Sequence, residues 1–429
     1  MRYLPIDPAL FIRNRAAFAG AMKPRSVAVF NSNDVAPKSA DGVRRFIQQT
    51  DTFYLSGIDQ EETILLLCPD APDEKHREIL FIRETSDQIA TWEGPKHSRD
   101  EAREISGIRT VYWTSRFESV FRGLVLASEH IYLNTNEHLR ADVTVETRDA
   151  RFLKWCRDAY PLHRYERSAP ILHRLRAMKS GTETALIQTA CDITEKAFRR
   201  ILGFIRPGIW EFEIEAEICH EFLRRRSRGP AYEPIVASGP NACILHYVKN
   251  DRQCADGELV LMDFGAEYAN YAADLTRTIP VNGRFTPRQR AVYDAVLRVQ
   301  RAAIPMLRPG NTLKAYHEAV GTLMEGELIR LGLLDAEAVR QQDKAAPLYR
   351  TYFMHGTSHH LGLDVHDLGH ADRPFEPGMV FTCEPGIYIR EEGIGIRIEN
   401  DVLIRDQETV DLMRSVPVEA DEIEALMAG

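Results

Sequence analysis

Four of the 14 histidines in this chain fall within one short stretch, HGTSHHLGLDVHD, at positions 355–367. One aspartate lies between the last two of these histidines and another follows them. Imidazole is the commonest side-chain metal ligand and carries protons near neutral pH, so this crowding is typical of a metal or catalytic site. A histidine-rich surface loop is the alternative, and the stretch alone does not decide between the two.

Two aspartates interrupt apolar, strand-like sequence in GELVLMDFGAEYANYAADLTRTIPV, where Asp263 ends a run of buried type and Asp274 follows a turn-like stretch. A hairpin centred near residues 268–269 would place the two carboxylates opposite one another, about 5 Å apart at Cβ. Like charges that face each other in a buried sheet repel and lose hydration, so such a pair persists when it shares a proton or binds a cation. A partly exposed pair at the end of a sheet is the alternative.

Two glutamates have the same character. Glu384 ends an apolar strand in GMVFTCEPGIYI, where Pro385 holds it in extended geometry. In GIGIRIENDVLI, alternation places Arg397 and Glu399 on one face of a strand. An Arg–Glu salt bridge would account for that pair, but it does not explain acidic groups at the ends of three apolar strands.

Two divalent cations would balance the negative charge of the four carboxylates, which belong to Asp263, Asp274, Glu384 and Glu399. A histidine is the natural fifth ligand, and bridging carboxylates could hold the ions about 3.5–4 Å apart. Carboxylate-rich coordination with one imidazole favours manganese over a zinc site of thiolate type. The sequence therefore predicts a two-metal hydrolytic site.

The first third of the chain, which must fold beside these residues, alternates strand-like and helix-like segments. We predict strands at 27–32, 53–58, 63–70, 78–83, 110–115 and 130–134, with helices near 8–22, 98–106 and 116–128. This alternation indicates an α/β domain of about 150 residues.

The remainder mixes longer helices with separate strands. Capping boxes at Ser180/Glu183 and Thr286/Gln289 each predict the start of a helix. Further helices are expected near 170–177, 211–226 and 312–331, and strands at 234–237, 258–264, 270–280, 379–384 and 394–404. Because these elements are segregated, we expect an α/β N-terminal domain with its linker over 1–175 and an α+β catalytic domain over 176–429.

Composition limits the partners and the compartment. The 429 residues are 44% hydrophobic and 27% charged, and the net charge of −9 argues against nucleic acid as a partner. We find no signal peptide and no apolar run long enough to span a bilayer, so no membrane partner is expected. The seven cysteines lack a C-x-x-C pair, which favours reduced thiols and a cytoplasmic protein.

The order and context of these motifs resemble a known family. MDFGAEY with ADLTRT, then HGTSHHLGLDVH, CEPGIY and GIRIEN are similar to the pita-bread (creatinase/aminopeptidase-like) metallopeptidases. The proline-specific branch, which contains Xaa-Pro aminopeptidase (aminopeptidase P) and prolidase, is the most similar. FYLSGIDQEETILLL extends the resemblance into the N-terminal domain of that branch. The resemblance implies five ligands for two divalent ions, with Mn²⁺ favoured and Zn²⁺, Co²⁺ or Fe²⁺ as alternatives: Asp263, Asp274, His359, Glu384 and Glu399. His360 competes with His359 for this role, and the SH-x-LG context of the family places the ligand at His359.

The resemblance also implies roles for other residues. PIVASGPNACILHY resembles the substrate loop of the family, which would place His246 beside the scissile group and Tyr232 nearby. His355 and His366 would contact the substrate and stabilise the tetrahedral intermediate, and Arg397 would orient Glu399 or assist proton transfer. For each of these side chains alone, a structural role is the alternative.

The implied reaction is hydrolysis of the Xaa-Pro bond at the N-terminus of peptides, by a hydroxide that bridges the two ions. Glu384 would take the proton of the nucleophile and pass it to the leaving nitrogen. Prolidase, restricted to Xaa-Pro dipeptides, is one alternative, and an inactive binding scaffold of the same fold is another. The expected partner is a peptide with proline in second position, and a homo-oligomer, dimer or tetramer, is implied by the resemblance.

Overall fold

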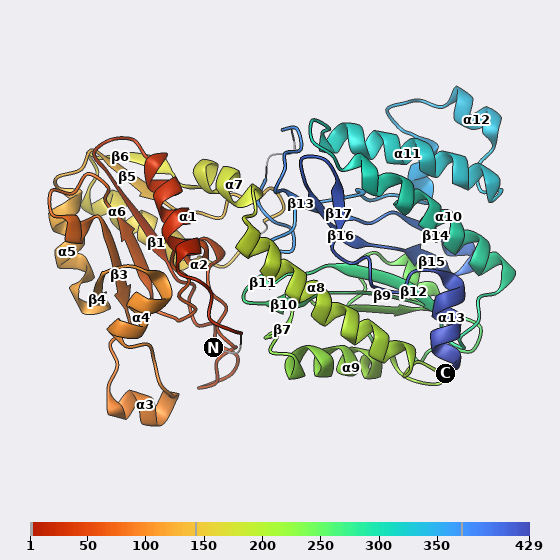
Figure 1. Ribbon diagram of the computed structural model, residues 1–429, viewed down its shortest axis with the longest axis horizontal. Helices are drawn as coiled ribbons and strands as arrows, with labels where there is room; N and C mark the ends of the chain where they lie inside the picture. The colour runs from red at the N-terminus through yellow and green to blue at the C-terminus, as the bar shows by residue number, and fades with distance from the viewer. Residues whose placement is uncertain (1–2, 142–143, 370–371) are drawn as a thin grey trace. The chain divides into compact units, whose positions relative to one another are not determined.

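The chain forms two compact units in the computed structural model, which describes residues 3–141, 144–369 and 372–429 (Figure 1). The N-terminal unit comprises Pro5–Leu175, and the C-terminal unit comprises Arg176–Gly429. Tyr3 and Leu4 belong with the C-terminal unit. The ring of Tyr3 lies 6.4 Å from that of Tyr268, and the Leu4 amide donates a hydrogen bond to the Tyr268 hydroxyl over 3.3 Å.

A six-stranded sheet organises the N-terminal unit, in the order β4-β3-β2-β1-β5-β6. The central strand β1 pairs antiparallel with β2 and parallel with β5. The strands are β1 Ser26–Asn31, β2 Ile64–Leu67, β3 Glu78–Ile82, β4 Thr110–Trp113, β5 His130–Leu133 and β6 Arg164–Arg167. The helices that begin in this unit are α1 Ala9–Gly20, α2 Thr50–Ser56, α3 Asp87–Glu93, α4 Arg99–Ser106, α5 Phe117–Val125, α6 Arg148–Ala159 and α7 Ala169–Ala177. The sheet and its helices confirm the predicted α/β class.

One predicted strand is wrong. Residues 53–58 belong to helix α2 and the turn after it, not to the sheet. The Gln49 side chain caps the helix by accepting from the Thr52 amide, and Gly57 ends it in the left-handed conformation at φ 69°. Every residue from Asp51 to Ser56 is buried, so the run carries no period that distinguishes a short buried helix from a strand.

The C-terminal unit packs short sheets between helices (Figure 1). Its strands are β7 Gly229–Pro230, β8 Ile235–Ser238, β9 Leu259–Phe264, β10 Ala266–Tyr268, β11 Tyr271–Ala272, β12 Leu275–Pro280, β13 Val380–Cys383, β14 Gly386–Ile389, β15 Ile394–Arg397, β16 Asn400–Ile404 and β17 Thr409–Asp411. Its helices are α8 Gly181–Leu202, α9 Glu211–Arg224, α10 Pro287–Ala303, α11 Leu313–Arg330, α12 Ala336–Gln341 and α13 Ala420–Ala428. This segregation confirms the predicted α+β class.

The predicted capping boxes start the helices that cover the sheets. The Ser180 hydroxyl accepts from the Glu183 amide at the start of α8, and Thr286 does the same for Gln289 at the start of α10. The helix α8 packs on β10 and β11, and α10 packs on β15. The strands β8, β9 and β12 form one antiparallel sheet whose apolar face is buried, which leaves the strand ends to present polar groups.

Among the described residues, none of the helices combines the length and the apolar character that a membrane crossing requires.

Candidate metal centre

The hairpin that carries the two aspartates differs in register from the prediction. Asp263 pairs with Thr276, not with Asp274, because the two-residue turn lies at Ala269 and Asn270. Both turn residues adopt positive φ, 53° and 67°, as a tight turn between antiparallel strands requires. Asp263 and Asp274 therefore lie diagonally on one face of the hairpin instead of directly opposite each other.

A glycine makes this diagonal arrangement possible. Gly265 lies across the hairpin from Asp274, and a Cβ at this position would come 1.6 Å from the Ala273 carbonyl oxygen. The two backbones approach so closely here that no side chain fits. The close approach of the two strands beside Asp274 therefore requires a glycine at this position.

A tyrosine hydroxyl joins the two aspartates. The Tyr232 hydroxyl oxygen lies 2.5 Å from Asp263 Oδ1 and 2.5 Å from Asp274 Oδ1. A hydroxyl has one proton to donate, so it satisfies one carboxylate while the other needs a proton of its own or a cation. Burial first, and then the charge of Asp263, raise the pKa of Asp274 well above its usual range. Burial and both aspartates raise the pKa of Tyr232, so this hydroxyl stays protonated.

The histidine segment brings one imidazole to these carboxylates. His359 Nε2 lies 3.4 Å from Asp274 Oδ2 and 3.8 Å from Glu384 Oε1. Asp274, His359 and Glu399 each offer a ligand atom within 4.8 Å of the others. His359 Nδ1 lies 2.9 Å from the His360 carbonyl oxygen, so Nδ1 is the donor and Nε2 is left to coordinate. The ring of His360 instead lies 4.2 Å from that of Phe381.

Burial raises the pKa of the carboxylates in the cluster by more than the neighbouring positive charges lower it. Burial is the main cause that raises the pKa of Glu384, to about 7, and the other acids of the cluster add to it. Burial, then Asp274 and Glu384, raise the pKa of Glu399. Buried carboxylates that repel one another need protons or cations. Oxygen-rich donors with one imidazole nitrogen fit hard or borderline divalent cations.

Arg397 contacts the cluster through Asp263, not through Glu399. Its Nη2 donates to Asp263 Oδ2 over 2.5 Å, and its Nε donates to the Thr276 hydroxyl over 3.0 Å. That hydroxyl donates in turn to Glu399 Oε2 over 2.6 Å. Arg397 therefore reaches Glu399 through Thr276, and the simple Arg–Glu salt bridge is not what the structure shows for this pair.

His355 lies beside the carboxylates as a neutral imidazole. Its Nε2 lies 2.8 Å from the Tyr388 hydroxyl, and its Nδ1 lies 2.8 Å from the Gly356 carbonyl oxygen and 3.7 Å from Glu384 Oε2. Burial, followed by the Arg397 charge, lowers the pKa of His355 to about 3. The Tyr388 hydroxyl accepts from Arg397 Nη1 over 2.8 Å, so it can donate to His355.

The other two predicted histidines occupy different positions. The ring of His366 meets the ring of His359 edge-on, with centroids 4.4 Å apart. His246 is exposed on the segment after β8, and its charge is a minor cause of the lowered pKa of His355. The structure therefore gathers the five predicted ligands, His355, His366, Tyr232 and Arg397 at one place, with His246 at the edge.

Sequence reasoning missed three side chains that hold this arrangement: Thr276, Tyr388 and Asp401. Asp401 Oδ2 accepts from the Asp274 amide over 2.9 Å and from the Cys191 thiol over 3.4 Å. Thr276 and Asp401 lie two residues after Asp274 and Glu399, and Tyr388 lies four after Glu384, so strand alternation was the available signal. Threonine and tyrosine are ordinary strand formers, and this signal alone does not mark them as polar partners.

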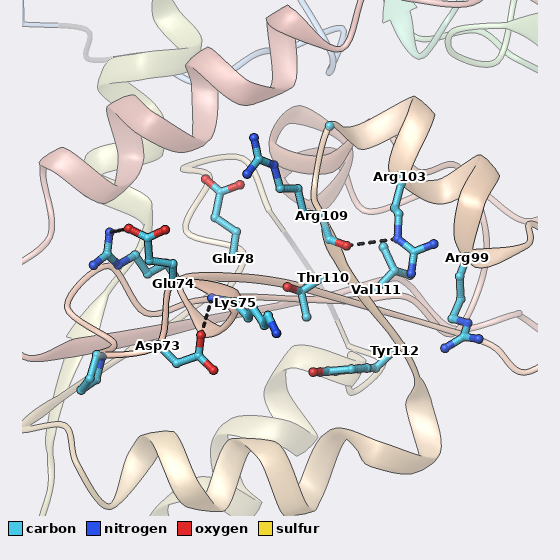
Figure 2. A pocket seen from close by; sticks show the side chains of 13 residues that line it. Asp73, Glu74, Lys75, Glu78, Arg99, Arg103, Arg109, Thr110, Val111 and Tyr112 are labelled. Carbon is cyan, nitrogen blue, oxygen red and sulfur yellow. Dashed lines mark hydrogen bonds and ion pairs between the residues drawn. The ribbon is translucent and has the colours of Figure 1, made fainter.

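A pocket of about 920 Å³ lies elsewhere, on the N-terminal unit (Figure 2). It opens beside β3 and β4, and Figure 2 shows the side chains of Glu78, Arg103 and Arg109 around it. None of the predicted site residues lines it. The candidate metal centre therefore rests on the carboxylate cluster and not on this pocket.

The fold and the cluster define a hydrolase of the metallopeptidase class, and comparisons with known proteins identify its family. The model of metallopeptidase family M24 matches residues 185–406, and that of the aminopeptidase P N-terminal domain matches residues 11–132. The chain therefore belongs to family M24, in the aminopeptidase P group of the pita-bread metallopeptidases, as the sequence motifs predicted.

Individual relatives agree with this assignment. The chain is 37% identical to an Xaa-Pro aminopeptidase of Escherichia coli, over 98% of this chain and 97% of the relative. The structure of E. coli aminopeptidase P with the inhibitor Pro-Leu superimposes with a TM-score of 0.87, at 36% identity over 99% of each chain. A zinc-substituted form of that E. coli enzyme in complex with product also matches, with a TM-score of 0.87, 36% identity and 99% of each chain covered.

Proposed function

We propose that this protein is a metal-dependent exopeptidase that removes the first residue from peptides with proline in second position. The single observation that carries this proposal is the cluster in which Asp274, His359 and Glu399 bring ligand atoms within 4.8 Å of one another, beside Glu384 and Asp263, in a chain of family M24. The E. coli relative is an Xaa-Pro aminopeptidase, and its structure binds Pro-Leu as an inhibitor. The same kind of ligand is expected for this chain.

We propose that two divalent cations bind the predicted ligands Asp263, Asp274, His359, Glu384 and Glu399. Protons that the buried acids otherwise retain would be displaced, which the raised pKa values of Asp274, Glu384 and Glu399 support. The oxygen-rich donor set favours Mn²⁺, and Zn²⁺, Co²⁺ and Fe²⁺ are alternatives. A related enzyme accepts zinc.

We propose separate roles in amide hydrolysis for the cations and for the residues around them. Cations bound by these ligands would supply electrostatic polarisation of the scissile carbonyl and a water acidic enough to attack near neutral pH. Glu384 Oε2 faces His355 and can hold the proton of the attacking water and release it to the leaving proline nitrogen. His355, kept neutral, donates from Nδ1 to the Gly356 carbonyl, and Tyr388 and Arg397 hold its ring beside Glu384, where the imidazole can contact the substrate.

Specificity for proline follows from the chemistry of the scissile bond. The nitrogen of an Xaa-Pro bond carries no hydrogen and its ring fixes φ, so the site must recognise the ring and not an N–H group. We propose that His246, His366 and Tyr232 contact the substrate. Tyr232 and His366 already touch the ligand cluster, and His246 is exposed at its edge, where an incoming peptide can reach it.

The proposal is tested by turnover of a peptide series with Mn²⁺ supplied. Xaa-Pro-Yaa tripeptides should be cleaved, and Xaa-Ala-Yaa tripeptides should not. Preferential cleavage of Xaa-Pro dipeptides would favour prolidase instead. Asp274→Asn and Glu384→Gln should abolish turnover while circular dichroism remains native, and Asp294→Asn on the surface of α10 is the control. Near-normal turnover in either of the first two variants would contradict the mechanism.

We further propose a cytoplasmic homo-oligomer, a dimer or a tetramer. All seven cysteines are free, and six of them are buried, which suits a reducing compartment. Analytical ultracentrifugation of the purified protein gives the oligomeric state, and a monomer at micromolar concentration would contradict the proposal.

A further inference from the structure

Four charged side chains lie against the histidine segment. We name Arg176, Lys179, Asp364 and Asp367 the anchor cluster. Arg176 Nη2 lies 2.7 Å from Asp364 Oδ2 and 2.5 Å from Asp367 Oδ1, and Lys179 Nζ lies 2.9 Å from Asp367 Oδ2. The side chains of Arg176, Lys179 and Asp367 are 2%, 0% and 1% exposed. The Asp364 side chain is 43% exposed, so two positive charges and one carboxylate are buried and a second carboxylate at the edge completes the balance of charge.

The anchor cluster packs directly on the histidine segment. A Cβ on Gly362 would lie 2.1 Å from Asp367 Oδ2 and 2.8 Å from Lys179 Cε, so the carboxylate occupies the place of a side chain. The Gly362 carbonyl accepts from the Ala272 amide over 2.8 Å. The segment is thus fixed on one side to the cluster and on the other to the hairpin that carries Asp274.

A single carbonyl oxygen connects the anchor cluster to the predicted metal ligand. The Asp367 amide donates to the His360 carbonyl oxygen over 2.9 Å. His359 Nδ1 donates to the same oxygen over 2.9 Å. This bond keeps the proton on Nδ1, so that Nε2 faces Asp274. The backbone position of Asp367 therefore sets the tautomer and the direction of the His359 ring.

The same segment places a second imidazole. His366 lies between the two aspartates of the cluster, and its ring rests edge-on against that of His359 at 4.4 Å. Both aspartates are bound by the guanidinium of Arg176. A shift of either aspartate would consequently move His366 relative to His359.

Stability alone does not explain a buried ionic cluster. Desolvation of buried charges offsets most of their attraction, and apolar replacements of similar shape often serve as well or better. Burial opposes ionisation of Asp367, yet Arg176 and Lys179 lower its pKa below the usual range, so the carboxylate stays charged. An ionised group with directional partners fixes a geometry more strictly than an apolar contact does.

We propose that Arg176, Lys179 and Asp367 are positioning residues that hold His359 and His366 in the geometry required for cation binding and peptide hydrolysis. This inference rests on the proposed function, since the ligand role of His359 is part of it. The three residues act through the His360 carbonyl and the backbone of the segment, not by contact with the substrate.

The test compares Asp367→Asn, the charge-balanced pair Asp367→Asn/Lys179→Met, and the wild type. Three quantities are measured on the full chain: the Kd for Mn²⁺ by calorimetry, the His359 tautomer by ¹⁵N NMR of the cation-free protein, and kcat on an Xaa-Pro-Yaa peptide. We expect the Kd to rise and kcat to fall by about tenfold or more in both variants. The Nδ1–H tautomer of His359 should no longer dominate.

The paired variant separates positioning from simple stability. Asp367→Asn alone leaves two buried cations with one full carboxylate and destabilises the fold, whereas the pair restores the balance of charge. A merely structural role predicts that the pair regains stability, Kd and tautomer together. A positioning role predicts that the pair regains the melting temperature while the Kd and the tautomer stay altered.

A matched control exists in the same unit. Glu327 is a buried carboxylate with two arginine partners, Arg298 and Arg330, on α10 and α11. Glu327→Gln should lower the melting temperature and leave the Kd and the His359 tautomer unchanged. A folded paired variant with wild-type Kd and tautomer would overturn the inference. If the wild type cleaves no Xaa-Pro peptide, the proposed function fails, while the tautomer still tests the anchor cluster.

Discussion

Thr276 gives the sharpest test of how the carboxylates are held. Its side chain is fully buried on β12, donates to Glu399 Oε2 over 2.6 Å and accepts from Arg397 Nε over 3.0 Å. Thr276→Val keeps the shape of the side chain and removes both bonds. Glu399 loses the donor that orients it, and a buried guanidinium N–H loses its acceptor.

The expected magnitude follows from these two losses. A buried polar group that loses its partner costs about 1–3 kcal/mol, and partners that orient a metal ligand are worth about 10–100-fold in affinity or activity. We therefore expect Thr276→Val to raise the Kd for Mn²⁺ and to lower kcat/KM by about 10–100-fold each. Calorimetric titration gives the Kd, and initial rates on an Xaa-Pro-Yaa peptide at saturating Mn²⁺ give kcat/KM.

Thr278 is the matched control. It lies two residues along the same strand face and is equally buried, but its hydroxyl meets only the backbone of Arg397, over 3.3 Å. Thr278→Val should change the Kd and kcat/KM by less than about fivefold, because these long bonds contribute about 1 kcal/mol or less. Equal effects of the two substitutions, or a Thr276→Val protein with wild-type Kd, would refute the reasoning.

Three further predictions concern other parts of the chain. Tyr388→Phe removes the hydroxyl between His355 and Arg397 and should lower kcat about tenfold or more in steady-state assays, with an unchanged far-UV spectrum; wild-type kcat would exclude a role for this bond. Gly265→Ala places a Cβ 1.6 Å from the Ala273 carbonyl oxygen, so the soluble yield and melting temperature should fall sharply, and a native-like melting temperature would show that the hairpin adapts. Burial raises the pKa of Asp149 to about 7, so the folded state favours its protonated form and the associated stability, full below about pH 4, is lost as the pH rises through 7. Asp149→Asn should therefore gain on the order of 2–3 kcal/mol relative to the wild type between pH 5 and pH 8 in urea unfolding, and a constant difference would contradict this.

The acidic strand ends could be predicted from the sequence because burial and charge conflict there. An aspartate at the end of the run Leu259–Met262 has no ordinary explanation in a sheet core, and the same holds for Glu384 after β13. The capping boxes of α8 and α10 were equally readable, because they combine specific residue types at a fixed spacing.

The register of the hairpin could not be predicted, because it depends on a turn without the usual residue types. Ala269 and Asn270 adopt left-handed conformations that a glycine would normally mark, so alternation alone placed the turn one position too early. The face of each strand was still correct, because the true pairing differs by two residues and preserves the alternation. The short helix α2 could not be recognised either, because its residues are buried on all sides and show no helical period.

The choice between adjacent histidines depends on tertiary contacts. The family context SH-x-LG favoured His359 over its neighbour, and the fold shows the contacts: His359 Nε2 faces Asp274, while the ring of His360 lies tilted against that of Phe381. The supporting Thr276 and Tyr388 could not be predicted either, because their polar role depends on segments far away in the chain.

The packing of Tyr3 and Leu4 on Tyr268 makes the N-terminal unit an insertion in the C-terminal one, since the backbone passes from one unit to the other twice. A fragment that starts at Arg176 would therefore lack Tyr3 and Leu4, which are part of the C-terminal unit. It would uncover Tyr268 at the tip of the very hairpin whose base carries Asp263 and Asp274. A variant that keeps Tyr3 and Leu4 joined to the C-terminal unit should keep the hairpin tip covered. A truncation that cuts only before Arg176 exposes it.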